Sequence, residues 1–281
     1  MLTFPNCKIN LGLHILQKRA DGFHDLETVF YPLPLKDALE VINATEKNKD
    51  STSSISFSSS GTPIEIQAEE NICTKAYHLL KKDFPQLPAI KMHLHKIIPT
   101  GAGLGGGSAD GAFALKLLNE KFNLGLNIEE LNHYASQLGS DCPFFILNKP
   151  CVATGRGEIL EPINLNLPGY KFVLVNPGIH ISTSWAFSQI TPALPRRSIK
   201  EIIQHPIETW KNELTNDFEI PVFKNYPEIK EIKDSLYKSG AVYTALSGSG
   251  STVFGIFKKE SKTSFSFPPH YFIKELINEL K

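Results

Sequence analysis

The chain has 281 residues, which is enough for two modest domains or one large one. Its 29 lysines and arginines balance its 29 aspartates and glutamates, so no positive field favours nucleic acid as a partner. No apolar stretch approaches the roughly 20 residues of a membrane span, and the N-terminus lacks the hydrophobic region of a signal peptide. We therefore expect a cytoplasmic protein that binds neither nucleic acid nor a membrane.

The cysteines do not form the C-x-x-C pairs that are typical of zinc sites. They indicate isolated thiols in a reducing compartment. The four positions are Cys7, Cys73, Cys142 and Cys151.

Residues 8–15 predict the first strand, because apolar and polar residues alternate strictly there. Such a strand is half buried, and the pattern alone would place Lys8 and Asn10 on a solvated face. A loop with a turn at Asp21-Gly22 follows. From residue type alone, we expect Phe23 in this loop to pack against other side chains and His24 to be exposed.

Short alternating segments continue to residue 66, at 26–32, 38–42, 51–60 and 63–66. They predict antiparallel hairpins, with a turn at 47–50. A helix is then predicted over 71–83, where apolar residues recur on one face. Residues 89–96 alternate again, so we expect a strand whose two histidines, His93 and His95, lie on a surface face. Lys96 at its end either meets phosphate or is solvated.

The densest signal in the chain is a glycine-rich loop, with five glycines within residues 101–107. An apolar run at 112–118 follows and predicts a helix, with Ser108 or a neighbour as its N-cap. Glycine lets backbone N–H groups approach a ligand closely, and a helix N-terminus adds free donors and partial positive charge. The loop therefore predicts a binding site for a phosphate chain.

Two common phosphate loops fit this segment poorly. A P-loop ends in Gly-Lys-Ser/Thr, whereas the chain has Gly106-Gly107-Ser108. The dinucleotide pattern G-x-G-x-x-G matches, but a turn and a second helix at 128–138 follow it where a βαβ unit requires a strand. An NAD-dependent oxidoreductase is therefore disfavoured.

The second half mixes strands and helices. Asp141 precedes Cys142-Pro143 at a helix start, where it either caps the helix or has a chemical role. Residues 151–160 predict a hairpin at a domain junction, which divides the chain into 1–158 and 159–281. Further expectations are strands at 170–175, 242–246 and 252–257, a short helix around 185–187, helices at 199–204, 208–214 and 227–239, and a glycine turn at 247–251.

Several motifs together carry a resemblance to known kinases. The pattern Pro-x-x-x-Gly-Leu-Gly-Gly-Gly-Ser at 99–108 resembles the ATP loop of the galactokinase, homoserine kinase, mevalonate kinase and phosphomevalonate kinase (GHMP) superfamily. Four further segments resemble, within it, the 4-diphosphocytidyl-2-C-methyl-D-erythritol kinase family. They are Pro5-x-x-Lys8-x-Asn10-Leu11, the loop 19–24 (Arg-Ala-Asp-Gly-Phe-His), residues 139–145 (Gly-Ser-Asp-Cys-Pro-Phe-Phe) and the turn 246–250. The resemblance runs from about residue 5 to about residue 258.

This resemblance implies an α+β, two-domain GHMP kinase fold, with a ribosomal-protein-S5-like first domain and a ferredoxin-like second domain. It implies ATP and Mg²⁺ as cofactors and a cytidine diphosphate-linked methylerythritol as the small-molecule substrate. The γ-phosphoryl group would pass to the substrate's 2-hydroxyl in the non-mevalonate isoprenoid pathway. The resemblance leaves the protein ligands of the metal and the oligomeric state open.

The resemblance also implies roles for individual residues. Asp141 matches the catalytic aspartate, Lys8 its partner and Asn10 a substrate-positioning residue. Phe23 and His24 match the pair that holds cytosine, although a related enzyme has tyrosine in place of Phe23. Phe187 would be a second aromatic wall. The ATP side would comprise Asn71, Lys96, Pro99, Thr100, Gly101, Ala102, Gly103, Leu104, Gly105, Gly106, Gly107, Ser108 and Ala109, with Ser108 near the phosphates and the metal.

Two alternatives stay open at this point. One is another alcohol kinase of the same superfamily, acting on mevalonate, homoserine or a sugar. The other is an inactive nucleotide or sugar sensor with the same fold.

Overall fold

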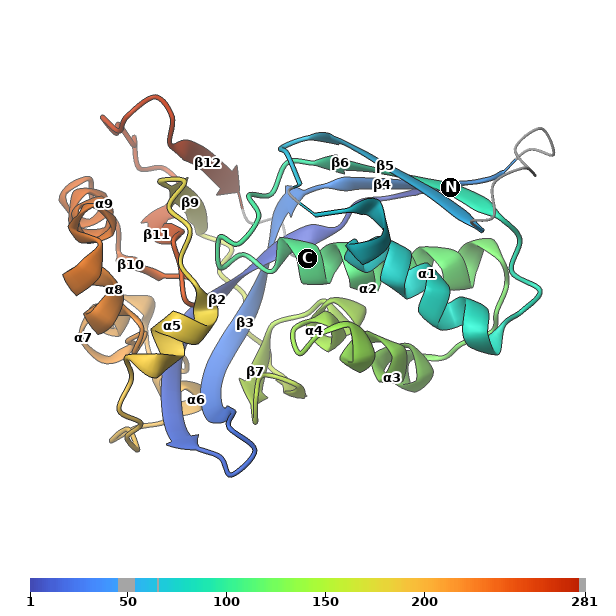
Figure 1. Cartoon of the computed structure of the whole chain (residues 1–281). Coiled ribbons are helices and arrows are strands. Elements are labelled where there is room, and N and C mark those ends of the chain that lie inside the picture. The colour runs from blue at the N-terminus through green and yellow to red at the C-terminus, as the bar shows by residue number, and fades with distance from the viewer. Residues whose placement is uncertain (45–53, 65, 278–281) are drawn as a thin grey trace. The chain divides into compact units, whose positions relative to one another are not determined.

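Figure 1 shows the computed structural model, which describes residues 1–44, 54–64 and 66–277. The predicted turn at 47–50 lies outside the described residues. The mixture of helices and strands confirms the α+β prediction. The chain forms two compact units, and each is described by itself. Unit 1 comprises Met1–Cys7, Leu35–Thr100 and Gly105–Asn148, and unit 2 comprises Lys8–Pro34, Gly101–Leu104 and Lys149–Lys281.

The sheet of unit 1 has the strand order β1-β4-β6-β5. Its strands are β1 (Leu2–Thr3), β4 (Ala38–Asn43), β5 (Ile55–Gly61) and β6 (Ile90–Lys96). Strand β5 pairs with β6 in parallel, so the prediction of antiparallel hairpins is wrong for this segment. The chain between them passes through helix α1 (Ile72–Asp83), which gives the crossover that a parallel pair needs. Alternation along one strand does not encode this direction.

Four helices of unit 1 form layers beside the sheet (Figure 1). Helices α1 and α2 contact its strands, and the shorter α3 and α4 pack on these two helices. Besides α1, the bounds are α2 (Gly106–Lys121), α3 (Ile128–Leu138) and α4 (Cys142–Leu147), and a short 3₁₀ segment, η2 (Ala68–Glu70), precedes α1. Caps match the predicted starts, because Asn71 accepts the Cys73 N–H and Asn127 forms a capping box with Glu130.

Helix α2 begins earlier than the sequence predicts. Its N-cap is Gly105, in the left-handed conformation with φ of +68°, and Ser108 is the third residue of the helix. A glycine adopts this conformation without the steric cost that other residues pay. The glycine-rich loop therefore supplies the first turn of the helix itself.

Unit 2 contains two sheets. One has the order β2-β3-β7-β8, and the other has the order β10-β11-β9-β12. The first comprises β2 (Asn6–Lys18), β3 (His24–Lys36), β7 (Cys151–Thr154) and β8 (Ile159–Pro162). The predicted hairpin at 151–160 is confirmed. Strand β2 is longer than predicted and is buried on both faces from Asn6 to Ile15, so the prediction of a half-buried strand is wrong.

The second sheet is antiparallel throughout and comprises β9 (Tyr170–Asn176), β10 (Tyr243–Leu246), β11 (Val253–Lys258) and β12 (Phe272–Ile277). Helices connect β9 to β10, and β12 returns to pair with β9, as in a ferredoxin-like domain. Residues 259–271, all of which are described, contain no helix, so an extended segment replaces the second helix of that pattern. Strand β12 was not predicted from the sequence.

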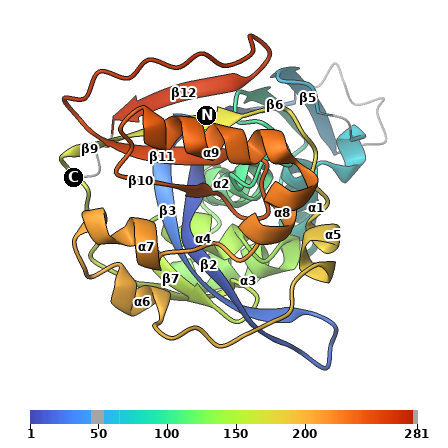
Figure 2. The same cartoon turned by 90° about the vertical axis from the view of Figure 1, so that its left-hand side faces the viewer.

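The helices of unit 2 are α5 (Thr183–Ser188), α6 (Ile199–Ile202), α7 (Trp210–Glu213), α8 (Glu219–Asn225) and α9 (Pro227–Lys238), with a 3₁₀ segment η3 (Ile207–Thr209) before α7. Helix α9 lies against β10 and β11 (Figure 2). Its apolar residues Ile229, Ile232 and Leu236 are buried in the unit's core, as their spacing predicts. In the described part of the chain, no helix is long and apolar enough to cross a bilayer.

Candidate active site

The predicted site residues fall into two groups. Unit 2 contains Lys8, Asn10, Phe23, His24, Gly101–Leu104 and Phe187. Unit 1 contains Asn71, Lys96, Pro99, Thr100, Gly105–Ala109 and Asp141.

Lys8 and Asn10 form a buried polar pair on β2. The two residues are 4% and 2% exposed, so the expectation of a solvated face is wrong. The Lys8 Nζ donates to Asn10 Oδ1 at 2.7 Å and lies 4.3 Å from the centroid of the Phe30 ring. Asn10 Nδ2 donates to Thr28 Oγ1 at 3.0 Å. These contacts offset the cost of burying the polar groups and fix their orientation.

The first half of the glycine-rich loop packs against the second glycine turn. Ser247 Oγ donates to Gly103 O at 2.8 Å, and the Asn10 N–H donates to Ser247 Oγ at 3.3 Å. A Cβ on Gly103, whose φ is +76°, would lie 2.0 Å from Ser247 O, so only glycine fits there. Ser247 thus joins the loop to the strand that carries Lys8. It was not among the predicted site residues, although the glycine turn at 247–251 was the signal for it.

The second half of the loop is the N-terminus of α2. The first turn of a helix has N–H groups without acceptors in that helix, and the helix dipole adds partial positive charge. A Cβ on Gly107 would meet no described atom within 4 Å, so the space beside this turn is open. These features suit the binding of a phosphate group.

Lys96 lies between two carboxylates in unit 1. Its Nζ is 2.5 Å from Asp37 Oδ2 and 2.7 Å from Asp110 Oδ2, and all three side chains are at most 3% exposed. We call Lys96, Asp37 and Asp110 the buried cluster. The alternative that Lys96 is solvated is therefore wrong. Asp37 Oδ1 also accepts the N–H groups of Ile97 and Ile98, directly before the glycine-rich loop.

The charges of the buried cluster are coupled. Burial raises the pKa of Asp110 to about 7, against the opposing effect of the Lys96 charge. Burial would lower the pKa of Lys96, but the two aspartates outweigh it and raise that pKa. Within the described part of the chain, Asp110 Oδ1 has no hydrogen-bond partner. One ammonium between two carboxylates therefore favours a proton on Asp110.

Asp141 directly precedes α4. Within this helix, every residue of which is described, no N–H group is capped by the Asp141 carboxylate. Asp141 thus occupies the N-cap position of α4 without capping the helix through its side chain. Next to it, Cys142 forms a hydrogen bond with Ser108 of α2, although burial raises the pKa of this thiol to about 12. The structure thus brings the first turn of α2 to the start of α4, beside Asp141.

Asn71 has a structural partner. Its side-chain oxygen accepts the Cys73 N–H at 2.9 Å and caps α1, and the residue is 3% exposed. Only its NH₂ group is left for a nucleotide.

Charged residues hold the 19–25 loop of unit 2. Arg19 pairs with Asp21 at 3.1 Å and with Asp25 at 2.9 Å, and we call these three residues the loop cluster. Asp21 Oδ1 also accepts the Phe23 N–H at 3.1 Å, and Gln17 donates to Asp25. This network fixes the backbone that presents Phe23 and His24. Its charged members were not among the predicted site residues.

The two aromatic residues of the loop differ from what their types alone indicate. Phe23 is 53% exposed, with the Arg156 guanidinium 4.7 Å from its ring centroid. His24 is half buried and stacks on Phe187, with centroids 5.0 Å apart and an interplanar angle of 18°. Burial, with a smaller effect of Lys18, lowers the pKa of His24 and favours its neutral form. A neutral imidazole offers one donor and one acceptor.

Among the described residues, no three His, Cys, Asp or Glu side chains are grouped so that they could hold a metal ion. Magnesium in kinases is bound largely by substrate phosphates, water and one or two protein oxygens. The Ser108 hydroxyl and the Asp141 carboxylate are oxygen donors of this kind on adjoining helices.

Comparisons with known proteins give the family. The family described as "GHMP kinases N terminal domain" matches residues 71–149, and "GHMP kinases C terminal" matches residues 198–264. A protein of Bacteroides fragilis named 4-diphosphocytidyl-2-C-methyl-D-erythritol kinase is 57% identical, over 93% of this chain and 94% of its own length. A protein of the same name from Azobacteroides pseudotrichonymphae is 51% identical, over 97% of this chain and 100% of its own length.

Solved structures agree with this. A 4-(cytidine 5'-diphospho)-2C-methyl-D-erythritol kinase is 31% identical and superposes with a TM-score of 0.77, covering 91% of this chain and 89% of that one. A mevalonate kinase of Methanococcus jannaschii is 15% identical with a TM-score of 0.66, over 93% and 92% of the two chains, which shows the fold alone. The chain therefore belongs to the 4-diphosphocytidyl-2-C-methyl-D-erythritol kinase family of the GHMP kinases.

Proposed function

We propose that this enzyme transfers the γ-phosphoryl group of ATP to the 2-hydroxyl of 4-diphosphocytidyl-2-C-methyl-D-erythritol in the non-mevalonate isoprenoid pathway. The observation that carries the proposal is the fixed 19–25 loop, which presents Phe23 and His24 at the end of β2, the strand that also carries the buried Lys8–Asn10 pair. A loop with an exposed ring and a neutral imidazole suits the flat, polar edge of a cytosine.

In the proposed mechanism, Asp141 accepts the proton of the substrate hydroxyl as phosphoryl transfer proceeds. That hydroxyl belongs to a tertiary alcohol and is crowded, so assistance to its deprotonation matters. Lys8 stabilises negative charge that develops on the transferred phosphoryl oxygens. Asn10 orients the Lys8 ammonium through the 2.7 Å hydrogen bond, and we propose that it also positions the acceptor hydroxyl.

We assign ATP binding to the glycine-rich loop and the N-terminus of α2, with Asn71 on the adenosine side. Mg²⁺, when bound, supplies charge neutralisation for the phosphates. The Ser108 hydroxyl is the protein oxygen we propose for it. Lys96 is enclosed by Asp37 and Asp110, so we propose that it affects ATP binding indirectly, by holding the glycine-rich loop in position.

The cytosine is expected beside the His24–Phe187 pair. The two rings are in contact at 5.0 Å, whereas a base between two parallel rings needs a centroid separation of about 7 Å, twice the carbon contact distance. The base therefore either stacks on an outer face of the pair or separates the rings when it binds. Phe23 is the exposed ring of the same loop and offers a further face.

We further propose a cytoplasmic enzyme with a small-molecule substrate and no nucleic acid or membrane partner. Its four cysteines are buried, and no disulfide is formed among the described residues, which suits a reducing compartment. Its formal net charge is zero, so no net positive field attracts a polyanion such as nucleic acid.

An ADP-release assay with ATP and Mg²⁺ tests the substrate. It compares 4-diphosphocytidyl-2-C-methyl-D-erythritol with mevalonate, homoserine and galactose. We expect turnover with the cytidyl substrate only. Turnover with another alcohol would keep the assignment as a kinase but overturn the proposed role of the 19–25 loop. No turnover with any of these substrates would favour an inactive sensor.

The substitution Asp141→Asn tests the base. We expect kcat to fall roughly 10²- to 10⁴-fold, the usual loss for a general base, while ATP binding persists. The matched control is Asp234→Asn, which changes an exposed aspartate of α9 that pairs with Lys230. Near-normal turnover of the Asp141 variant would remove this residue from the mechanism.

A further inference from the structure

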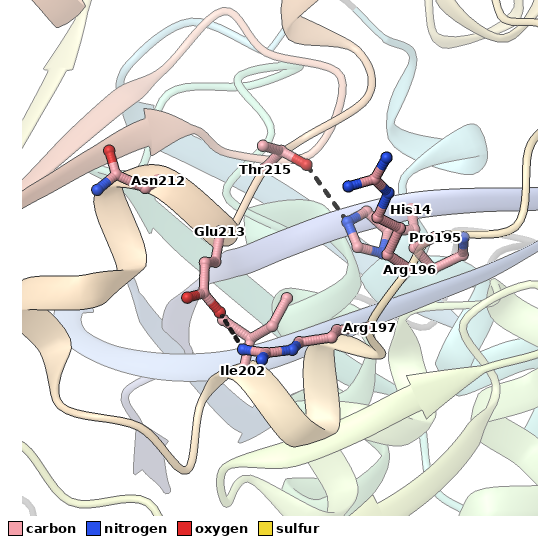
Figure 3. A pocket seen from close by; sticks show the side chains of 8 residues that line it. All are labelled: His14, Pro195, Arg196, Arg197, Ile202, Asn212, Glu213 and Thr215. Carbon is pink, nitrogen blue, oxygen red and sulfur yellow. Dashed lines mark hydrogen bonds and ion pairs between the residues drawn. The ribbon is translucent and has the colours of Figure 1, made fainter.

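A pocket of about 550 Å³ lies beside β2, an edge strand of its sheet in unit 2 (Figure 3). Its lining includes His14, Arg196, Arg197, Glu213 and Thr215. Pockets of this size hold small-molecule ligands. The function proposed above does not use it.

The walls of the pocket are fixed to β2 from two sides. On one side, the Ala193 N–H donates to Ile15 O at 3.1 Å, just before the arginines. On the other side, the Leu13 N–H donates to Thr215 O at 2.9 Å, and Asp217 Oδ2 accepts the Ile15 N–H at 2.7 Å. The two walls are therefore held in place by the fold itself.

The pocket has an excess of positive charge. The sequence contains only four arginines, and two of them, Arg196 and Arg197, line this pocket. Arg197 forms an exposed ion pair with Glu213 at 2.9 Å, and such pairs contribute little to stability. No carboxylate of the described chain pairs with Arg196. A ligand anion can therefore bind Arg196 directly and compete with Glu213 for Arg197.

A buried histidine adds polar groups on the protein side of the pocket. His14 is 5% exposed, and its Nε2 is 3.3 Å from Thr215 Oγ1. Its Nδ1 has no hydrogen-bond partner among the described residues. His14 follows Lys8 by six residues on β2, which places it about 20 Å away along an extended strand.

We propose that this pocket binds the phosphate group of a small molecule, at a site separate from the glycine-rich loop. Guanidinium groups match the oxygens of a phosphate in pairs of hydrogen bonds. Two guanidinium groups beside a hydroxyl match the several oxygens and the higher charge of a phosphate. A ligand with a single carboxylate would use this arrangement less fully. This proposal does not depend on the reaction proposed above.

The arginine side chains provide a direct test. We would label the full chain with [¹⁵N]arginine, so that the Nε–Hε spectrum contains only four signals, and titrate it with inorganic pyrophosphate without Mg²⁺. Substitutions Arg196→Gln and Arg197→Gln assign the two signals of interest. We expect both signals to shift with saturation, and citrate to bind this site more weakly. Shifts confined to Arg19 and Arg156 would place pyrophosphate elsewhere and overturn the proposal.

Variants test the direction of the effect. Arg196→Gln should raise the Kd for pyrophosphate, read from the Arg197 signal, by about tenfold or more, because a charged hydrogen-bond donor is lost. Glu213→Gln should lower this Kd, because it removes the competing carboxylate. Lys211→Gln, on the same helix α7 but outside the lining, should leave it unchanged. Equal affinity in Arg196→Gln, or citrate binding as tight as pyrophosphate, would refute the phosphate site.

Discussion

The buried cluster and the loop cluster have the same composition, one cation between two aspartates, but different surroundings. The ion-pair distances are similar, from 2.5 to 3.1 Å. In the loop cluster, the Arg19 side chain is 38% exposed, whereas in the buried cluster the Lys96 side chain is 1% exposed. Water screens the first cluster and is excluded from the second.

The pKa shifts follow this difference. In the loop cluster, a hydrogen bond from the Phe23 N–H, together with Arg19, lowers the pKa of Asp21. In the buried cluster, loss of solvation raises the pKa of Asp110. The loop cluster therefore holds a loop that remains solvated, whereas the buried cluster governs the folding stability of the protein. We infer that the buried cluster sets the position of the ATP loop and that the loop cluster sets substrate affinity.

The largest expected effect comes from Lys96→Met. It leaves two buried carboxylates without their cation, and removing one partner of a buried ion pair typically costs about 3–5 kcal/mol of folding free energy. Urea unfolding at pH 8 measures this. Lys116→Met, on α2 and partly buried, is the control and should cost much less. A loss below about 1 kcal/mol would make the two clusters equivalent.

Asp110→Asn should change how stability depends on pH. The folded protein holds the Asp110 proton with a pKa of about 7, against an ordinary value of 3.8. The contribution of this group to stability is therefore complete below about pH 4 and is lost as pH rises through about 7. Relative to the parent, the variant should gain about 1.4 kcal/mol per pH unit across this range.

Urea unfolding at pH 5, 6, 7 and 8 measures the effect of Asp110→Asn. Asp234→Asn serves as an exposed control. Parallel pH profiles for parent and Asp110 variant would mean that the buried cluster keeps both carboxylates ionised throughout.

Arg19→Gln should affect binding and leave stability almost unchanged. Exposed ion pairs add little to folding, so the urea midpoint should barely move. The KM for the cytidyl substrate should rise about three- to tenfold, the cost of ordering one or two loop side chains on binding. Steady-state kinetics at two ATP concentrations separates this from a change in ATP affinity. A large loss of stability with unchanged KM would reverse the roles of the two clusters.

The smallest effect is expected from Phe23→Tyr. Phe23 is 53% exposed and its ring faces Arg156, so a phenol oxygen would sit largely in water. We expect the KM for the cytidyl substrate to change less than about threefold, since a solvated hydrogen bond adds little net energy. Phe23→Ala is the comparison and should raise KM more. A tenfold gain in the tyrosine variant would indicate a direct contact of the phenol with the base.

Much of the local structure was predicted correctly from the sequence. The helices at 72–83, 128–138 and 227–238 and the hairpins at 151–162 and 243–258 lie where periodicity and turn residues placed them. These features depend on neighbours two to four residues apart, so the local pattern contains them. The glycine-rich loop and its motifs were sufficient to recognise the family.

What the local pattern could not contain were contacts between distant segments. Lys8 and Asn10 have the spacing of a solvated face, yet other parts of the chain bury them. Lys96 meets Asp37 from 59 residues away, and Ser247 meets Gly103 from 144 residues away. No periodicity encodes such pairs.

The sequence by itself thus determined the types of most elements, the position of the glycine-rich loop and the family. Only the tertiary structure decided that β5 pairs in parallel with β6, that the lysine before the loop is enclosed by carboxylates, and that Arg196 and Arg197 share a pocket with His14. The physical reason is that burial and charge pairing depend on which segments the fold brings together, whereas propensity and periodicity act only along the chain.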